Sequence, residues 1–134
     1  MSPNLDKKLI KDFPILFQDR YGSMRETAMC WGFECGDGWE PIIRELAIFI
    51  EDINKSALPE DQAIVATQVK EKYGALCFYV DFVPEVWADA VYAAIDEAEK
   101  KSEVTCERCG RKGKLRGRGW YYTACGYHTR KEDR

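Results

Sequence analysis

The C-terminal part of the chain holds four potential metal ligands in two closely spaced pairs. Cys106 and Cys109 form a Cys-x-x-Cys pair, and Cys125 and His128 form a Cys-x-x-His pair after the insert 110–124. Two residues between ligands allow one tight turn to aim both side chains at the same ion, and the insert can return as a hairpin. Because four protein ligands leave no open position, the spacing predicts a structural Zn²⁺ site.

This metal-binding segment divides the chain into two parts. We expect residues 1–102 to form an α+β core domain and residues 103–134 to form a zinc-ribbon-like module, which is too short to hold itself together without metal. The charge changes near the same boundary, because residues 1–100 carry 10 basic and 19 acidic side chains, whereas residues 101–134 carry 10 basic and 4 acidic. The split leaves room for a local basic surface on an acidic protein.

The spacing of apolar residues predicts the elements of the core. Segments with helical spacing are residues 4–13, 39–54 and 84–102, and segments that alternate as strands do are residues 28–35, 65–73 and 76–80. Gly74 separates the last two strands and would supply the turn of a hairpin, whose core face would include Tyr73. The expected fold class is α+β, with a small antiparallel sheet of about three strands packed on one face by about three helices, plus the C-terminal zinc-ribbon-like hairpin.

The stretch "GFECGDGWEPII", residues 32–43, joins the first predicted strand to the second predicted helix. Asp37 and Glu40 have the D-x-x-E spacing of a capping box, in which each side chain bonds a free backbone amide at the helix start. On this interpretation Asp37→Ala would cost about 1 kcal/mol of stability. The carboxylates disfavour an anion here, so Asp37 and Trp39 are instead candidates for one wall of a pocket.

Two groups of polar, basic and aromatic side chains are candidates for binding an anionic ligand. They are Gln68, Lys70, Lys72 and Tyr79 on the predicted hairpin, and Arg116, Arg118 and Trp120 on the ribbon. Basic side chains interleaved with aromatic ones suit contacts to phosphates and bases. Two other interpretations stay open, namely an ordinary solvated strand face and ribbon cations that only solvate the ribbon or pair with the acidic core.

The remaining cysteines and the N-terminal segment bear on location. Cys30, Cys35 and Cys77 fall on predicted strands and are expected to be free thiols, since no histidine is left to accompany them. The sequence lacks an apolar run long enough to cross a membrane and the apolar region of a signal peptide. We therefore expect a cytoplasmic protein with reduced thiols.

Three motifs occur in a characteristic order, namely "GFECGDGW", "VATQVKEKYGALCFYV" and "CERCG…GRGW…CGYH". Together they resemble a family of small uncharacterised proteins of tailed bacteriophages and prophages, with the pattern GFxCGDGW, VKEK(Y/F)GxLxFY and a C-terminal CxxC…CxxH zinc ribbon. The resemblance covers most of the chain from Trp31 onward, although Cys77 stands where the family pattern places a basic residue. It implies a phage origin, location in the host cell cytoplasm and a zinc ribbon, but no activity.

Three functions are open at this point. The first is a non-enzymatic phage accessory protein that binds a host protein or a nucleotide-type small molecule and counteracts host antiviral defence. The second is a nucleic-acid-binding regulator that uses the basic ribbon. The third is a small hydrolase that uses Glu34, Asp37 and Glu40, which is disfavoured because no spare histidine and no open metal position exist. A homodimer through an exposed edge strand is also possible.

Overall fold

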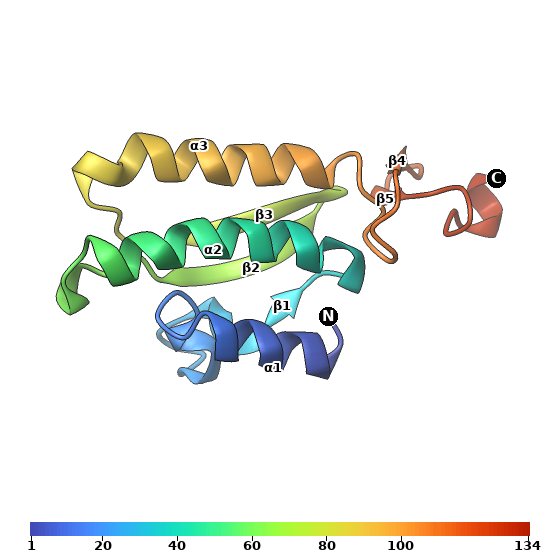
Figure 1. Ribbon diagram of the computed structural model, residues 1–134. Helices are drawn as coiled ribbons and strands as arrows, with labels where there is room; N and C mark the ends of the chain where they lie inside the picture. Colours follow the sequence, from blue (N-terminus) through green and yellow to red (C-terminus); the bar gives the residue numbers. More distant parts are fainter.

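The computed structural model describes residues 1–134 and contains three α-helices, a three-stranded sheet and a two-stranded sheet (Figure 1). The helices are α1 (Pro3–Asp12), α2 (Glu40–Ser56) and α3 (Glu85–Ser102), and the strands are β1 (Phe33–Glu34), β2 (Ala66–Lys72), β3 (Ala75–Val80), β4 (Lys114–Arg116) and β5 (Tyr122–Ala124). The predicted α+β class is confirmed. None of the helices has the length and apolar character needed to cross a membrane.

One hydrophobic core joins the elements of residues 1–102. Helices α2 and α3 lie side by side, and α3 packs on β3 (Figure 1). Buried apolar residues of both helices belong to the same cluster as those of the sheet. Phe17, in the segment after α1, is fully buried and packs edge to face against Phe33 and Phe78, with ring centroids 4.9 and 6.3 Å away. These aromatic contacts tie α1 and β1 to the two long strands.

The sheet is mixed rather than wholly antiparallel. Its order is β1-β2-β3, with β2 and β3 antiparallel and β1 parallel to β2. The expectation of an antiparallel sheet was therefore wrong for β1. The reason is topological, because α2 lies between β1 and β2 in the sequence and can return the chain to the same end of the sheet.

The first predicted strand, residues 28–35, is largely a turn of 3₁₀-helix. Ala28–Trp31 is helical, and the Thr27 hydroxyl accepts a hydrogen bond from the Met29 amide at its start. Met29 is fully buried while Trp31 is 61% exposed, so the alternating pattern did not describe one face of a strand. Gly32 ends the turn with a φ of +77°, which an L-residue rarely adopts.

The hairpin forms as expected, but the residues of β2 that face the core differ from the predicted ones. A register shift between Ala66 and Gln68 places Ala66 and Val69 in the core, instead of an unbroken alternation from residue 65. Tyr73 is 74% exposed, because Tyr73 and Gly74 both have positive φ and form the turn itself. The prediction that Tyr73 packs in the core was wrong.

Helix α3 covers the outer edge of β3. The Leu76 amide donates a hydrogen bond to the Ser102 hydroxyl at 2.8 Å, and the Phe78 amide donates to the Glu99 carboxylate at 3.0 Å. These donors are therefore used within the chain, which reduces the ability of this edge to pair with a second copy. Homodimerisation stays a prediction.

We expect Ser102→Ala to lower the free energy of unfolding by about 1–3 kcal/mol, because the buried Leu76 amide would lose its acceptor. Urea denaturation followed by circular dichroism measures the change. Ser56→Ala is the matched control, because Ser56 is exposed and bonds only the Asp52 side chain. It should change stability by less than about 0.5 kcal/mol. Equal effects of the two substitutions would contradict the assigned role of Ser102.

Candidate metal centre and adjoining pocket

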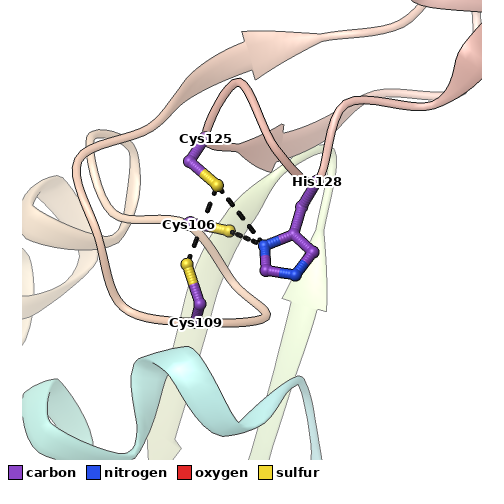
Figure 2. A group of neighbouring side chains, drawn as sticks. All are labelled: Cys106, Cys109, Cys125 and His128. Carbon is purple, nitrogen blue, oxygen red and sulfur yellow. Dashed lines mark hydrogen bonds between the residues drawn. The ribbon is translucent and has the colours of Figure 1, made fainter.

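The four predicted metal ligands converge at one end of the core. Cys106 and Cys109 lie in the loop after α3, whereas Cys125 and His128 follow β5, and Figure 2 shows all four side chains pointing toward one another. Their ligand atoms all lie within 4.8 Å of one another. The antiparallel pair β4–β5 supplies the hairpin that brings the second pair back to the first. The cluster can therefore hold a metal ion, as the spacing predicted.

The distances between the ligand atoms fit tetrahedral coordination of one metal ion and are too long for a disulfide bond. The Nδ1 atom of His128 lies 3.5 Å from the Cys106 sulfur and 3.3 Å from the Cys125 sulfur, and the sulfurs of Cys109 and Cys125 are 3.7 Å apart. A tetrahedral ion at about 2.3 Å from sulfur and about 2.0 Å from nitrogen gives edges of about 3.8 Å between sulfurs and about 3.5 Å from sulfur to nitrogen. A disulfide would instead need about 2.05 Å between sulfurs.

The backbone around Cys106 favours the thiolate that a metal requires. Burial alone raises the pKa of this thiol, but backbone hydrogen bonds to its sulfur from Cys125, Cys109 and Arg108 lower the pKa to about 6. By contrast, burial raises the pKa of Cys35 to about 12, which keeps it a neutral thiol. Cys30, Cys35 and Cys77 take no part in the cluster, in agreement with the expectation of free thiols.

The loop that carries the first two ligands is seated on the stretch Gly36–Trp39. The Gly38 amide donates to the Glu107 carbonyl at 2.7 Å, and the Gly36 amide donates to the Glu107 carboxylate at 2.9 Å. The indole nitrogen of Trp39 donates to the Thr105 carbonyl at 2.8 Å. The glycines serve close packing here, because a Cβ on Gly38 would overlap with the Cys106 carbonyl oxygen.

This seat replaces the predicted capping box. A 3₁₀ turn, Asp37–Trp39, precedes α2, and no side-chain cap bond forms at the start of that helix. The Asp37 carboxylate instead accepts the Ser2 amide at 2.7 Å, and Glu40 accepts the Arg44 guanidinium at 2.7 Å. The cap interpretation was therefore wrong, and with it the stated reason for the cost of Asp37→Ala.

The residues proposed for a pocket wall or for hydrolysis are placed differently from what the sequence indicated. Trp39 is fully buried, so it is a core residue rather than a pocket wall. Glu34 and Asp37 are exposed and Glu40 is half-buried against Arg44, and these three carboxylates do not form a metal-binding group.

A cavity of about 290 Å³ lies where the ribbon meets the end of β2. Its lining residues are Lys70, Glu71, Lys72 and Tyr73 from the hairpin and Gly119, Trp120 and Tyr121 from the ribbon. The Thr123 hydroxyl donates to the Gly74 carbonyl, and the Leu115 side chain lies against Gly74, so the ribbon is held on the hairpin turn. The structure thereby brings together Lys70, Lys72 and Trp120, which the sequence had placed on separate surfaces.

The other candidate binding residues lie outside this cavity. Gln68 and Tyr79 are cross-strand partners further along the hairpin, away from the turn. Arg116 donates to the Ala124 carbonyl at 2.9 Å and so braces the ribbon. Arg118 lines a second cavity, of about 230 Å³, together with Trp120 and Arg130. Sequence reasoning missed Arg130, and its only signal was its place two residues after the last ligand.

The cations of the ribbon are free of ion pairs with carboxylates. All seven salt bridges of the protein join side chains within residues 1–101, and none includes a basic side chain of residues 103–134. The interpretation that these cations pair directly with the acidic core therefore fails. Arg116 and Arg134 donate to backbone carbonyls, whereas the other ribbon cations form no side-chain hydrogen bond.

In comparisons with known proteins, no family model, no curated protein and no solved structure matches the chain. The phage resemblance stays a prediction.

Proposed function

We propose that the protein is a non-enzymatic, zinc-stabilised binding protein whose ligand is a nucleotide-type anion. The observation that carries the proposal is the cavity in which Lys70 and Lys72 of β2 face Trp120 of the ribbon. Three thiolates and one imidazole in a closed tetrahedral arrangement favour Zn²⁺, and the ion's role is to fold the ribbon.

The cavity offers a separate partner for each part of a nucleotide. Lysine ammonium groups can bind phosphate as point charges, while the exposed rings of Tyr73, Trp120 and Tyr121 can stack on a base. Glu71 also lines the cavity, but its carboxylate accepts the Gly74 amide at 2.6 Å and stabilises the turn. The volume of about 290 Å³ is small for a ligand site and suits one nucleotide better than a large cofactor.

The cellular role follows from the resemblance rather than from the cavity. A phage accessory protein in the host cytoplasm that sequesters a nucleotide signal would counteract a defence that depends on that signal. A host protein is the other partner in this class. Binding without turnover supports either role, and recovery of a cleaved ligand would contradict both.

The double substitution Lys70→Ala/Lys72→Ala should weaken nucleotide binding at least about 10-fold, because one charge-assisted contact contributes about 1.5 kcal/mol or more. Isothermal titration calorimetry with a panel of linear and cyclic nucleotides measures the change in affinity. The nucleotides are analysed afterwards for cleavage. Lys7→Ala/Lys11→Ala on α1 is the matched control, because it removes the same charge from exposed positions that do not line the cavity. If no nucleotide binds the unaltered protein, the proposed function is wrong.

A further inference from the structure

Trp120 lines two cavities. One of them also contains Lys70 and Lys72, and the other, of about 230 Å³, also contains Arg118 and Arg130. Its side chain is 74% exposed. A cavity that contains an exposed indole and two cations therefore occurs twice, with the same tryptophan shared by both.

The backbone of the ribbon tip forms a tight turn next to this tryptophan. Gly117 has a φ of +101°, and a Cβ there would overlap with the Trp120 carbonyl oxygen, so the chain folds closely back on itself. Gly119 has a φ of +87° with open space around it. The tip is thus a tight turn that presents Trp120 outward rather than packing it on the core.

The second cavity is built around a fixed arginine. The Arg130 guanidinium lies over the Tyr122 ring at 4.2 Å from its centroid, and the Arg130 amide donates to the Tyr122 hydroxyl at 3.0 Å. Glu132 and Asp133 also line this cavity, and the Tyr122 hydroxyl donates to the Asp133 carboxylate at 2.6 Å. Neither Arg118 nor Arg130 forms a salt bridge.

We propose that the ligand is a segment of single-stranded nucleic acid that crosses Trp120, with one phosphate-binding pair of cations on each side. Lys70 and Lys72 bind the backbone on one side of the indole, Arg118 and Arg130 bind it on the other, and bases stack on the exposed aromatic rings between them. This inference rests on the proposed function, since it extends the same cavity. It goes further because it requires at least two consecutive nucleotides.

The chemistry favours a single strand over the alternatives. Stacking on a protein ring needs an unpaired base, which a duplex does not offer. A mononucleotide would engage one cavity and leave the Arg118 and Arg130 side unused. Cationic side chains interleaved with stacking rings are the arrangement that tracks a nucleic-acid backbone with little dependence on base sequence.

The test compares thymidine monophosphate with a fluorescently labelled oligothymidylate of about eight nucleotides, a typical site size for a small module. Titration calorimetry follows the former and fluorescence anisotropy the latter. The variants are Lys70→Ala/Lys72→Ala, Arg118→Ala/Arg130→Ala and Trp120→Ala, with Lys7→Ala/Lys11→Ala and Trp31→Ala as controls. Trp31 is a matched control because it is 61% exposed and lines neither cavity. Zinc content and thermal unfolding confirm that each variant is folded.

We expect the oligonucleotide to bind at least about 10-fold more tightly than the monophosphate, since a second stacked base adds a comparable factor. Arg118→Ala/Arg130→Ala should weaken binding of the oligonucleotide at least about 10-fold and leave binding of the monophosphate unchanged. Trp120→Ala should weaken the binding of both ligands. The logarithmic salt slope should be about −3 for four cations and about −1.5 when either pair is removed, at about 0.7 per phosphate neutralised.

The possible failures are distinguishable. If the monophosphate binds through Lys70 and Lys72 but the oligonucleotide binds no more tightly, and Arg118→Ala/Arg130→Ala has no effect, the inference is overturned while the proposed function stands. A duplex of the same length that binds as tightly as the single strand also overturns the inference. If neither the oligonucleotide nor any nucleotide of the panel binds, both proposals are overturned.

Discussion

Chelation is expected to unfold residues 103–134 and to loosen the start of α2. The buried hydrophobic cluster of the ribbon contains only Cys106, Ala124 and Cys125, and two of these are ligands. Structural zinc supplies about 10–16 kcal/mol of apparent binding free energy in ribbon-sized peptides, which is the scale of the loss. Native mass spectrometry should show one zinc ion per chain before chelation, and hydrogen exchange should show lost protection in residues 103–134 after it.

The effect should reach the core through the seat at Gly36–Trp39. Amides at Gly36 and Gly38 donate to Glu107, so these amides should exchange faster once the loop is released. Cys109→Ser should reproduce the effect of chelation, whereas Cys77→Ser should keep the zinc and the protection, because Cys77 is outside the cluster. An ordered ribbon after complete chelation would show that the metal is not its main stabilising contact.

The metal-dependent stability should also fall in acid. The pKa of Cys106 lies at about 6, below its ordinary value of 9.0, so the thiolate contributes stability that is fully present above pH about 9 and is lost as the pH falls through about 6. Protons and metal compete for the same sulfur, so zinc release follows the same direction.

A second large effect is expected for Gly38→Ala. The new Cβ would overlap with the Cys106 carbonyl oxygen and meet backbone atoms of Glu107 and Gly110. All of these are main-chain atoms of the metal loop, so relief requires movement of the loop or of the start of α2. Overpacking against a fixed backbone, together with strain on the Gly38–Glu107 hydrogen bond, should cost about 3 kcal/mol or more.

Denaturation in excess zinc measures this cost, and a zinc-competition titration should show weaker metal affinity as well. Gly126→Ala is the matched control, because a Cβ on Gly126 meets no heavy atom within 4 Å and Gly126 has no positive φ. It should change stability by less than about 0.5 kcal/mol. A Gly38→Ala protein as stable as the unaltered one would mean that the loop does not depend on this close approach.

The metal ligands, the long helices and the hairpin were accessible from the sequence because each has a local signature. Cys106, Cys109, Cys125 and His128 were found from spacing alone, and their ligand atoms indeed converge. The helices α2 and α3 follow apolar stripes that need no knowledge of distant residues.

The stretch Gly36–Trp39 was misinterpreted because its partner lies far away in the sequence. Its glycines and tryptophan resemble a turn with a helix cap, yet they contact Thr105, Cys106 and Glu107. The prediction of a strand at residues 28–35 was wrong for a related reason. Met29 and Trp31 alternate with polar or small residues as strand residues do, but Met29 is buried and Trp31 is exposed. Long-range contacts decide these positions, and a local pattern carries no information about them.

The candidate binding site was found in pieces and not as a unit. Lys70, Lys72 and Trp120 were each singled out, but only the docking of the ribbon on Gly74 brings them to one cavity. Tyr73 was assigned to the core because its positive φ could not be foreseen from the alternation. Arg130 carries no local motif, and its role depends on the fold of the C-terminal segment.

A metal-folded ribbon is expected to complete the nucleotide-binding surface on the hairpin. Oligothymidylate anisotropy titrations with the zinc-loaded protein, the chelated protein and the chelated protein after zinc is restored test this expectation. Since Trp120 is carried by the ribbon whereas Lys70 and Lys72 belong to β2, we expect binding to be lost on chelation and regained with zinc. Equally tight binding by the zinc-loaded and chelated proteins, with the ribbon shown to be unfolded in the latter, would contradict this expectation.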